Sequence, residues 1–301
     1  AKPFEGHSAI IQRNALKSWK LLHPEVEVIL FGDEEGSAEV CAEYGLRHEP
    51  HVERFESRMP YMDFLFGRAQ EIARHEYVCY SNCDIVLTGD FWSAFESTVA
   101  WSKRFLLISR RWDVDIKEPV DFRRADWARE LREYAVMNGV QQNELFIDFF
   151  LFPRGIYADM PRFIVGYCYW DNWAVWRALS AGVPVIDASS ITVPVHQNHE
   201  YTTTPERFKG SYLEPNSMRN FQIAGGFRHL RNIGDATHLL TRQGMEGNAR
   251  RYWMAAKHAS AEMRHILLYK VWFPVWFPLL NASRPLRTAL GLRRKSAGHR
   301  E

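Results

Sequence analysis

The chain has 301 residues, of which 46% are hydrophobic and 25% charged, so it is long enough to bury a large core. Its formal net charge of only +2 argues against nucleic acid as the main partner. The four cysteines form no C-x-x-C pair, which argues against a disulfide-rich secreted domain and favours a reducing compartment. No signal peptide is visible, and we therefore expect a cytoplasmic protein.

Helix and strand patterns alternate through the first part of the chain. Apolar residues at helical spacing over 7–22 are followed by an apolar strand pattern over 26–31. Residues 37–44 and 62–73 predict two further helices, and residues 46–51 predict a short strand between them. This alternation is typical of right-handed crossovers, so we expect an α/β fold with a mostly parallel sheet flanked by helices.

A strand predicted over 77–80 ends abruptly in Asn82-Cys83-Asp84. A buried strand that delivers a carboxylate at its C-terminal end places the charge where open α/β sheets bind ligands. A hard divalent cation needs oxygen ligands such as that of Asp84, and it is suited to holding phosphates. The alternative is a solvated Asp84, in a strand whose Asp90 only caps the helix that follows.

The rest of the chain supplies elements of both kinds. Helices are predicted over 91–99, 126–137, 170–179 and 248–269. Strands are predicted over 105–109, 144–152, 183–186 and 191–195. The residues from 200 to about 247 are polar and rich in turn residues. We therefore expect one catalytic domain over 1–240, followed over 241–301 by a helical, amphipathic appendage.

Asp113-Val114-Asp115 is the only literal D-x-D of the chain, and it follows Arg110-Arg111-Trp112. Asp113 and Asp115 are therefore candidates for a metal site or for the lining of a sugar pocket. In the second case Arg110 and Arg111 would neutralise phosphate. The alternative is a salt-bridged turn on the surface.

Two further acids are candidates for proton transfer. Asp148 lies in a very apolar strand, where a carboxylate needs either a partner or a shifted pKa. Asp171 opens a helix between Trp170 and Trp173, so the helix dipole is expected to keep it ionised and the aromatic rings to form walls for a sugar. We expect Asp171 to be the general base, with a plain helix N-cap as the alternative role.

Five short motifs occur in a consistent order: N-x-D-I, R-R-W-D-x-D-I, F-x-F-P-R-G, W-D-N-W and H-Q-N-H. With these motifs the chain, from residue 3 to about residue 240, resembles nucleotide-sugar glycosyltransferases of the GT-A fold, and in particular bacterial glycosyltransferase-like proteins. It departs from their pattern in that the first nucleotide-binding strand is absent or truncated. Asn82 also replaces the first acid of the usual D-x-D.

The resemblance implies a role for each matching residue. Asp84 would bind Mg²⁺ or Mn²⁺, His196 would complete the metal shell or touch the diphosphate, and Asn82 would bind the ribose or the metal shell. Asp33 would contact the base or its ribose, with a simple turn acid as the alternative. Arg68 would reach the diphosphate, unless it is a solvated helix residue or a partner of the nearby Glu71.

The resemblance also implies an enzyme that moves a sugar from a nucleoside diphosphate to a hydroxyl of a glycan or lipid-linked glycan, in the synthesis of surface glycans. A sugar-nucleotide pyrophosphorylase and a non-catalytic glycan-binding protein of the same fold are the alternatives. Whether the reaction inverts or retains the anomeric configuration is left open.

The C-terminal segment combines apolar, aromatic and basic residues. Residues 266–280 read ILLYKVWFPVWFPLL, and an arginine-rich stretch follows. The apolar run is shorter than the ~20 residues that span a bilayer, and two prolines interrupt it. We expect residues 266–295 to lie at the inner face of a membrane as an interfacial anchor, with docking onto the catalytic domain or onto a second subunit as the alternative.

Overall fold

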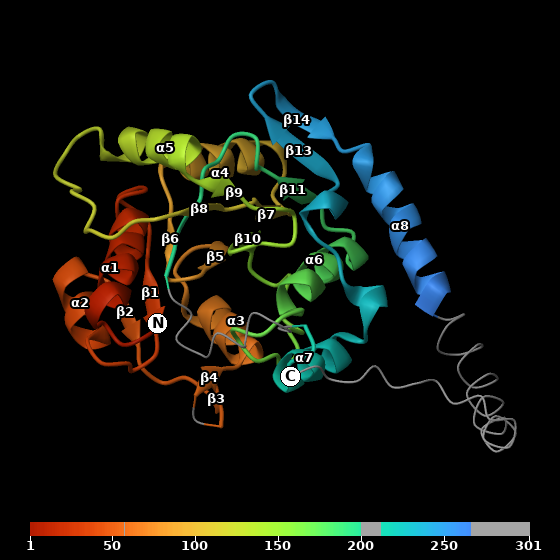
Figure 1. The fold of residues 1–301 in the computed structure, drawn as a ribbon, viewed down its shortest axis with the longest axis horizontal. Helices are drawn as coiled ribbons and strands as arrows, with labels where there is room; N and C mark the ends of the chain where they lie inside the picture. The colour runs from red at the N-terminus through yellow and green to blue at the C-terminus, as the bar shows by residue number, and fades with distance from the viewer. Residues whose placement is uncertain (57, 200–211, 266–301) are drawn as a thin grey trace, which may run out of the picture. The chain divides into compact units, whose positions relative to one another are not determined.

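A computed structural model describes residues 1–56, 58–199 and 212–265. The chain divides into two compact units, Ala1–Arg251 and Tyr252–Glu301. Figure 1 shows the helices and strands of the first unit, which form a mixed α/β architecture.

All the helices except α7 lie close to where the sequence pattern places them. The bounds of the helices are α1 (Gly6–Lys20), α2 (Ser37–Tyr44), α3 (Met62–Ile72), α4 (Gly89–Trp101), α5 (Trp127–Asn138), α6 (Trp170–Ser180), α7 (Pro215–Ala224) and α8 (Arg250–His265). Two short 3-10 turns follow α7, η2 (Phe227–His229) and η3 (Ile233–Asp235). Asp90 is not the cap of α4, because Thr88 occupies the N-cap position.

The largest sheet has six strands in the order β14-β13-β11-β7-β10-β5. Its strands are β5 (Tyr77–Ser81), β7 (Leu106–Ile108), β10 (Phe149–Pro153), β11 (Val185–Asp187), β13 (His238–Thr241) and β14 (Gly244–Gly247). β11 is parallel to β7 and to β13, whereas β10 is antiparallel to β5 and to β7, and β14 is antiparallel to β13. The expected mostly parallel sheet is therefore a mixed one.

This pairing fixes the direction of each strand. Because β10 runs against both neighbours, β5 points the same way as β7, and through β11 the same way as β13. The carboxyl ends of these four strands therefore share one edge of the sheet, which is the edge where α/β proteins bind ligands. The sequence pattern could not predict that β10 is antiparallel, because hydrophobic periodicity carries no information about the direction of a strand.

A second sheet has the order β6-β12-β8-β9. Its strands are β6 (Ile85–Val86), β8 (Trp112–Val114), β9 (Val140–Gln141) and β12 (Val195–Gln197). β12 is antiparallel to β6 and parallel to β8. The predicted strand over 191–195 was misplaced, since β12 begins where that strand was expected to end.

The first predicted strand does not join the large sheet. β1 (Ile29–Phe31) pairs in parallel with β2 (Arg47–Glu49) in a separate two-stranded sheet. Leu16 of α1 and Val40 of α2 pack with Leu30 of β1 in one buried cluster. A two-stranded antiparallel pair, β3 (Arg54–Phe55) with β4 (Met59–Pro60), follows.

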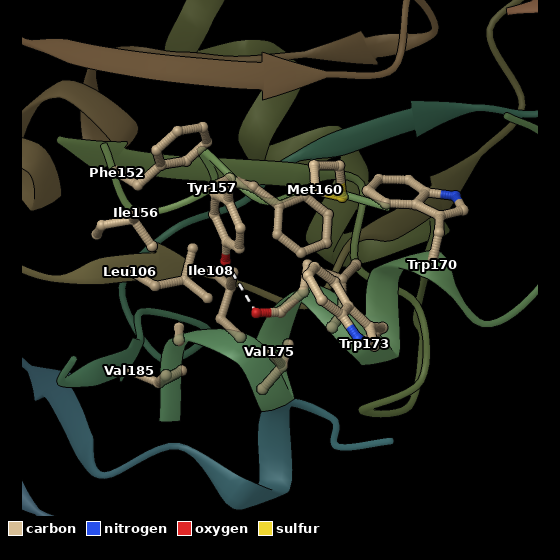
Figure 2. Close-up of a cluster of buried hydrophobic side chains, with 14 of the residues drawn as sticks. Leu106, Ile108, Phe152, Ile156, Tyr157, Met160, Trp170, Trp173, Val175 and Val185 are labelled. Atoms are coloured by element: carbon tan, nitrogen blue, oxygen red, sulfur yellow. Dashed lines mark hydrogen bonds between the residues drawn. The ribbon is translucent and has the colours of Figure 1, made fainter. Parts of the chain in front are cut away.

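The core of the first unit lies on both faces of β10. Phe150 and Phe152 pack into the cluster that contains residues of α3 and α6, part of which is drawn in Figure 2. Phe149 and Leu151 point to the other face and pack with Phe91 of α4. Side chains alternate across a strand, so an uninterrupted apolar run is what a strand covered on both faces requires.

The polar stretch from residue 200 onward contains more regular structure than expected, since α7, β13 and β14 all lie in it. The large sheet continues through β14 to Gly247. The predicted membrane-interface segment, 266–295, lies outside the described residues. Across the parts of the chain that the structure describes, each helix is too short or too polar to cross a bilayer.

Candidate metal and catalytic site

The register of the second sheet assembles the candidate site. His196 of β12 pairs with Ile85 of β6 on one side and with Asp113 of β8 on the other. Asp84 directly precedes β6, and it therefore lies next to the strand that carries His196. Residues far apart in the chain meet here because β12 is inserted between β6 and β8.

Asp84, His196 and His199 form the candidate metal group. Oδ2 of Asp84 lies 3.1 Å from Nε2 of His199 and 3.6 Å from Nε2 of His196. The ligand atoms of the three residues all lie within 4.8 Å of one another. Two ligands on opposite sides of a transition-metal ion are at most about 4.4 Å apart, so small side-chain shifts would bring all three onto one ion.

The backbone of Asp84 is held in place by Gln197, which lies between the two histidines. The carbonyl oxygen of Asp84 accepts hydrogen bonds from the backbone N–H of Gln197 at 3.1 Å and from its Nε2 at 3.2 Å. Nε2 of Gln197 also donates to the carbonyl oxygen of Ile11 in α1, and Oε1 accepts from Asn14. Gln197 is fully buried, so these bonds fix the turn that presents Asp84.

Asp113 connects the metal group to a buried arginine. Its Oδ1 lies 3.0 Å from Nδ1 of His196, within ion-pair distance, although the N–H direction of the ring is not aligned with that oxygen. Nε of Arg111 donates to the same Oδ1 at 2.7 Å, and Gln142 donates to Oδ2. Burial acts to raise the pKa of Asp113, but His196 and Arg111 outweigh this effect and hold the pKa below its usual value.

Arg111 continues the network to the start of β10. Its Nη1 lies 3.1 and 3.2 Å from the two carboxylate oxygens of Asp148, and both side chains are more than nine-tenths buried. Nδ2 of Asn82 donates to Oδ1 of Asp148 at 2.6 Å, and the hydroxyl of Tyr80 donates to Oδ1 of Asn82. Asp148 thus has the partners that a buried carboxylate needs. This geometry favours a role in holding Arg111 and Asn82, and the catalytic role expected for Asp148 stays a prediction.

The residues present fit a divalent cation. Asp84, Asp113 and Asp148 bring three carboxylates together, and Arg111 is the one cation that hydrogen-bonds two of them in this described network. Oδ1 of Asp84 is buried and has no hydrogen-bond partner within the described residues. Burial alone would raise the pKa of Asp84, but the hydrogen bond from His199 and the charges nearby hold it lower. An ionised carboxylate oxygen without a donor, beside two imidazole nitrogens, is a donor set that binds metal.

Asp171 lies in the first turn of α6, close enough to Asp148 for their charges to interact. Burial raises the pKa of Asp171 to about 7, the hydrogen bond from the backbone N–H of Asn172 opposes this, and the charge of Asp148 adds to it. At neutral pH about half of Asp171 is therefore ionised, so the helix dipole does not offset the effect of burial in full. The N-cap alternative was wrong, because Tyr169 occupies that position.

The aromatic walls expected around Asp171 are part of the core instead. Trp170 and Trp173 are 6% and 5% exposed. The ring of Trp170 packs against Phe150 and Tyr80, and that of Trp173 packs against Phe163 (Figure 2 shows both tryptophans in the buried cluster). The sequence alone could not show whether these tryptophans bind a sugar or pack in the core, because both roles are compatible with a position beside Asp171.

Four of the expected binding residues have partners outside this network. Asp33 is exposed and pairs with Arg54, and Arg68 pairs with Glu49 and Glu71. The backbone N–H of Arg110 donates to Ser189, and the exposed Asp115 accepts a hydrogen bond from Asn198. A metal site formed by Asp113 and Asp115 stays a prediction, as do the binding roles of these four residues.

Gln197 is a site residue that the sequence did not single out, and His199 ranked behind His196 as the second histidine of H-Q-N-H. The H-x-x-H spacing was visible, but the strand was predicted to end at Val195, which left His199 in an unplaced loop. A strand placed over Val195–Gln197 would have carried His196 into the sheet and brought His199 to its end.

Comparisons with known proteins identify no family. No family model matches the chain, and no curated protein matches it. A solved structure described as "Crystal Structure of a Mycobacterial Protein" is similar, with a TM-score of 0.47 and 12% sequence identity, over 75% of this chain and 73% of that one. A similarity of this size carries no argument about function.

Proposed function

We propose that this protein transfers a sugar from a nucleoside diphosphate donor to a hydroxyl acceptor. The observation that carries the proposal is the group of Asp84, which follows the carboxyl end of β5, with His196 and His199, together with the unpartnered Oδ1 of Asp84. The order of the sequence motifs, which resembles that of GT-A glycosyltransferases, supports the same reaction class.

Asp84, His196 and His199 would hold the divalent cation. When bound, the cation supplies positive charge against the diphosphate that leaves with the nucleoside. Two imidazoles and one carboxylate suit Mn²⁺ better than Mg²⁺, because Mg²⁺ is bound mainly by oxygen ligands. The ion pair of Arg111 with Asp113 keeps that carboxylate facing the ring of His196, and Gln197 keeps the Asp84 turn in place.

Asp171 is the candidate general base for an inverting reaction. A base is most effective when its pKa lies near the working pH, and the pKa of Asp171 is about 7. Its carboxylate would accept the proton of the acceptor hydroxyl as that oxygen attacks the sugar. The negative charge of Asp148 raises the pKa of Asp171 and so favours uptake of the proton.

We further propose that the acceptor is a glycan or lipid-linked glycan, used in surface glycan synthesis at the cytoplasmic face of a membrane. The support is the sequence of 266–295, where apolar and aromatic residues precede a basic stretch. Co-sedimentation with anionic liposomes should be lost when the chain is shortened to end at Arg264. Equal co-sedimentation of both chains would remove the membrane partner.

The direct test is release of nucleoside diphosphate from a panel of UDP-, GDP- and TDP-sugars, with and without Mn²⁺. We expect release from at least one donor with Mn²⁺, and none after chelation or in Asp84→Ala. Turnover that requires pyrophosphate would instead identify a sugar-nucleotide pyrophosphorylase. Glycan binding without turnover of any donor would identify a binding protein.

A further inference from the structure

A second pocket, lined by residues outside the metal group, lies in the same compact unit. It is an open depression of the surface with a volume of about 610 Å³. The residues that line it are Gly89, Asp90, Ser93, Ala128, Arg132, Ile191, Thr241 and Arg242. They come from the start of α4, from α5, from the segment after β11, and from the end of β13 with the turn that follows it. None of them belongs to the candidate metal site.

Two arginines give the pocket its charge. Nε of Arg132 is buried and has no hydrogen-bond partner within the described residues. Nη1 of Arg132 lies 3.9 Å from Oδ1 of Asp90, too far for a hydrogen bond. Arg242 is exposed, and it makes no ion pair with another described residue. A ligand cannot reach the buried Nε, so the donors available to it are the Nη groups of Arg132, whose side chain is 37% exposed, and the guanidinium group of Arg242.

The one carboxylate in the lining is already engaged. The hydroxyl of Thr88 donates to Oδ1 of Asp90, and the backbone N–H of Val193 donates to Oδ2 at 2.7 Å. These bonds tie the start of α4 to the segment that follows β11. Because the lining contains two arginines and one aspartate, the pocket keeps one positive charge in excess.

The remaining lining combines polar and apolar groups. Ser93 lies in the first turns of α4, where its hydroxyl donates to the carbonyl oxygen of Gly89. α4 is a 13-residue helix, and its N-terminus favours negative charge. Ile191 and Ala128 contribute apolar surface. A pocket of this size therefore has room for a body larger than a bare inorganic ion, next to its cationic groups.

We propose that this pocket binds a small solute that carries a phosphate or carboxylate group on a sugar-sized body. Arginine binds both oxyanions through parallel N–H donors, so both sources share the same recognition chemistry. The site is independent of the proposed transferase reaction, because it uses neither the metal group nor Asp171. Its test therefore succeeds or fails whatever the fate of the proposed function.

The test is calorimetric titration of the full chain in EDTA, so that no metal-bound anion contributes. The probes are glucose 6-phosphate, glucuronate and glucose. We expect at least one of the two anions to bind and glucose not to bind, and the stronger anion identifies the source of the oxyanion. Arg132→Gln and Arg242→Gln should each weaken that binding about tenfold or more, as loss of a charge-assisted hydrogen bond does.

Arg129→Gln is the matched control. Arg129 lies on the same helix as Arg132, but it pairs with Asp126 and Glu133 on the surface and does not line the pocket. We expect it to leave the affinity unchanged. Arg242 is exposed, so its variant should fold even if Arg132→Gln does not. Failure of both anions to bind, unchanged affinity in Arg242→Gln, or an equal loss in Arg129→Gln would overturn the proposal.

Discussion

β10 and the residue that precedes it lie in very different surroundings. From Phe149 to Phe152 the strand is buried among apolar side chains, and the buried hydroxyl of Tyr157 in that cluster donates to the carbonyl oxygen of Ala174 (Figure 2). Immediately before it, Asp148 belongs to a buried network of acids with Arg111. The apolar cluster contains few polar groups that need hydrogen-bond partners. In the polar network, by contrast, Oδ1 of Asp84 has no donor among the described residues. We therefore expect the stability of the fold to depend on the first region and the proposed reaction to depend on the second.

The largest effect that would test this contrast is loss of activity without loss of fold. Asp84→Ala removes the carboxylate of the candidate metal group, and we expect nucleoside diphosphate release to fall by about 1000-fold. Thermal melting in EDTA should stay close to that of the unmodified protein. Asp121→Ala removes an exposed acid that pairs with Arg123 and serves as the control, with activity close to normal. Full activity in Asp84→Ala would refute the site.

The opposite result is expected in the apolar region. Phe150 is fully buried between Trp170 and Tyr80, and Phe150→Ala should lower the free energy of unfolding by about 3–5 kcal/mol. Met137→Ala, at an 81% exposed position, should cost less than about 0.5 kcal/mol. Urea unfolding monitored by tryptophan fluorescence measures both. A loss below 1 kcal/mol in Phe150→Ala would contradict the packing described here.

Asp171→Asn separates chemistry from binding. The amide cannot accept the proton of the acceptor, so we expect transfer to fall by about 100-fold or more. Binding of the nucleoside diphosphate, measured by calorimetry with Mn²⁺, should be unchanged. An equal loss of nucleotide binding would make Asp171 a structural residue of α6 and not a base.

The pH dependence sharpens the same assignment. Because the pKa of Asp171 is raised to about 7, its base form appears only as the pH rises through 7, and transfer should rise over the same range. Stability has the opposite sign: a raised pKa favours the protonated folded state, so this contribution is present below pH 4 and is lost as the pH rises toward 7. Asp171→Asn should remove both dependences, and a profile flat from pH 5 to 8 in the unmodified protein would contradict the assignment.

The smallest effect distinguishes the two acids of the D-x-D. Asp113→Asn removes the charge beside His196, and we expect Mn²⁺ affinity to fall by about tenfold, as loss of a group that orients a ligand does. Asp115→Asn should leave it unchanged, because Asp115 is exposed and bonds only to Asn198 among these residues. Electron paramagnetic resonance of Mn²⁺ measures both affinities. Similar losses in the two variants would restore the D-x-D as the metal site.

The sequence predicted most of the helices and the position of Asp84 after a buried strand, because periodicity and the end of an apolar run are local signals. It could not predict that β10 is antiparallel, or that β1 leaves the main sheet, since strand pairing depends on distant residues. For the site it placed His196 near Asp84 through the resemblance. The hydrogen bonds from Gln197 to the backbone of Asp84 could not be predicted, because they depend on the register of β12 between β6 and β8.

That register has a thermodynamic consequence. Ile85, Asp113 and His196 come from three distant parts of the chain, and they are neighbours only once the second sheet has closed. The candidate metal site therefore does not exist in the unfolded chain. A cation that binds this site in the folded protein would shift the folding equilibrium toward the folded state by mass action. At a free concentration 100 times its dissociation constant, the ion would add about 2.7 kcal/mol to the stability of the whole domain. Resistance to unfolding would then vary with the supply of the metal.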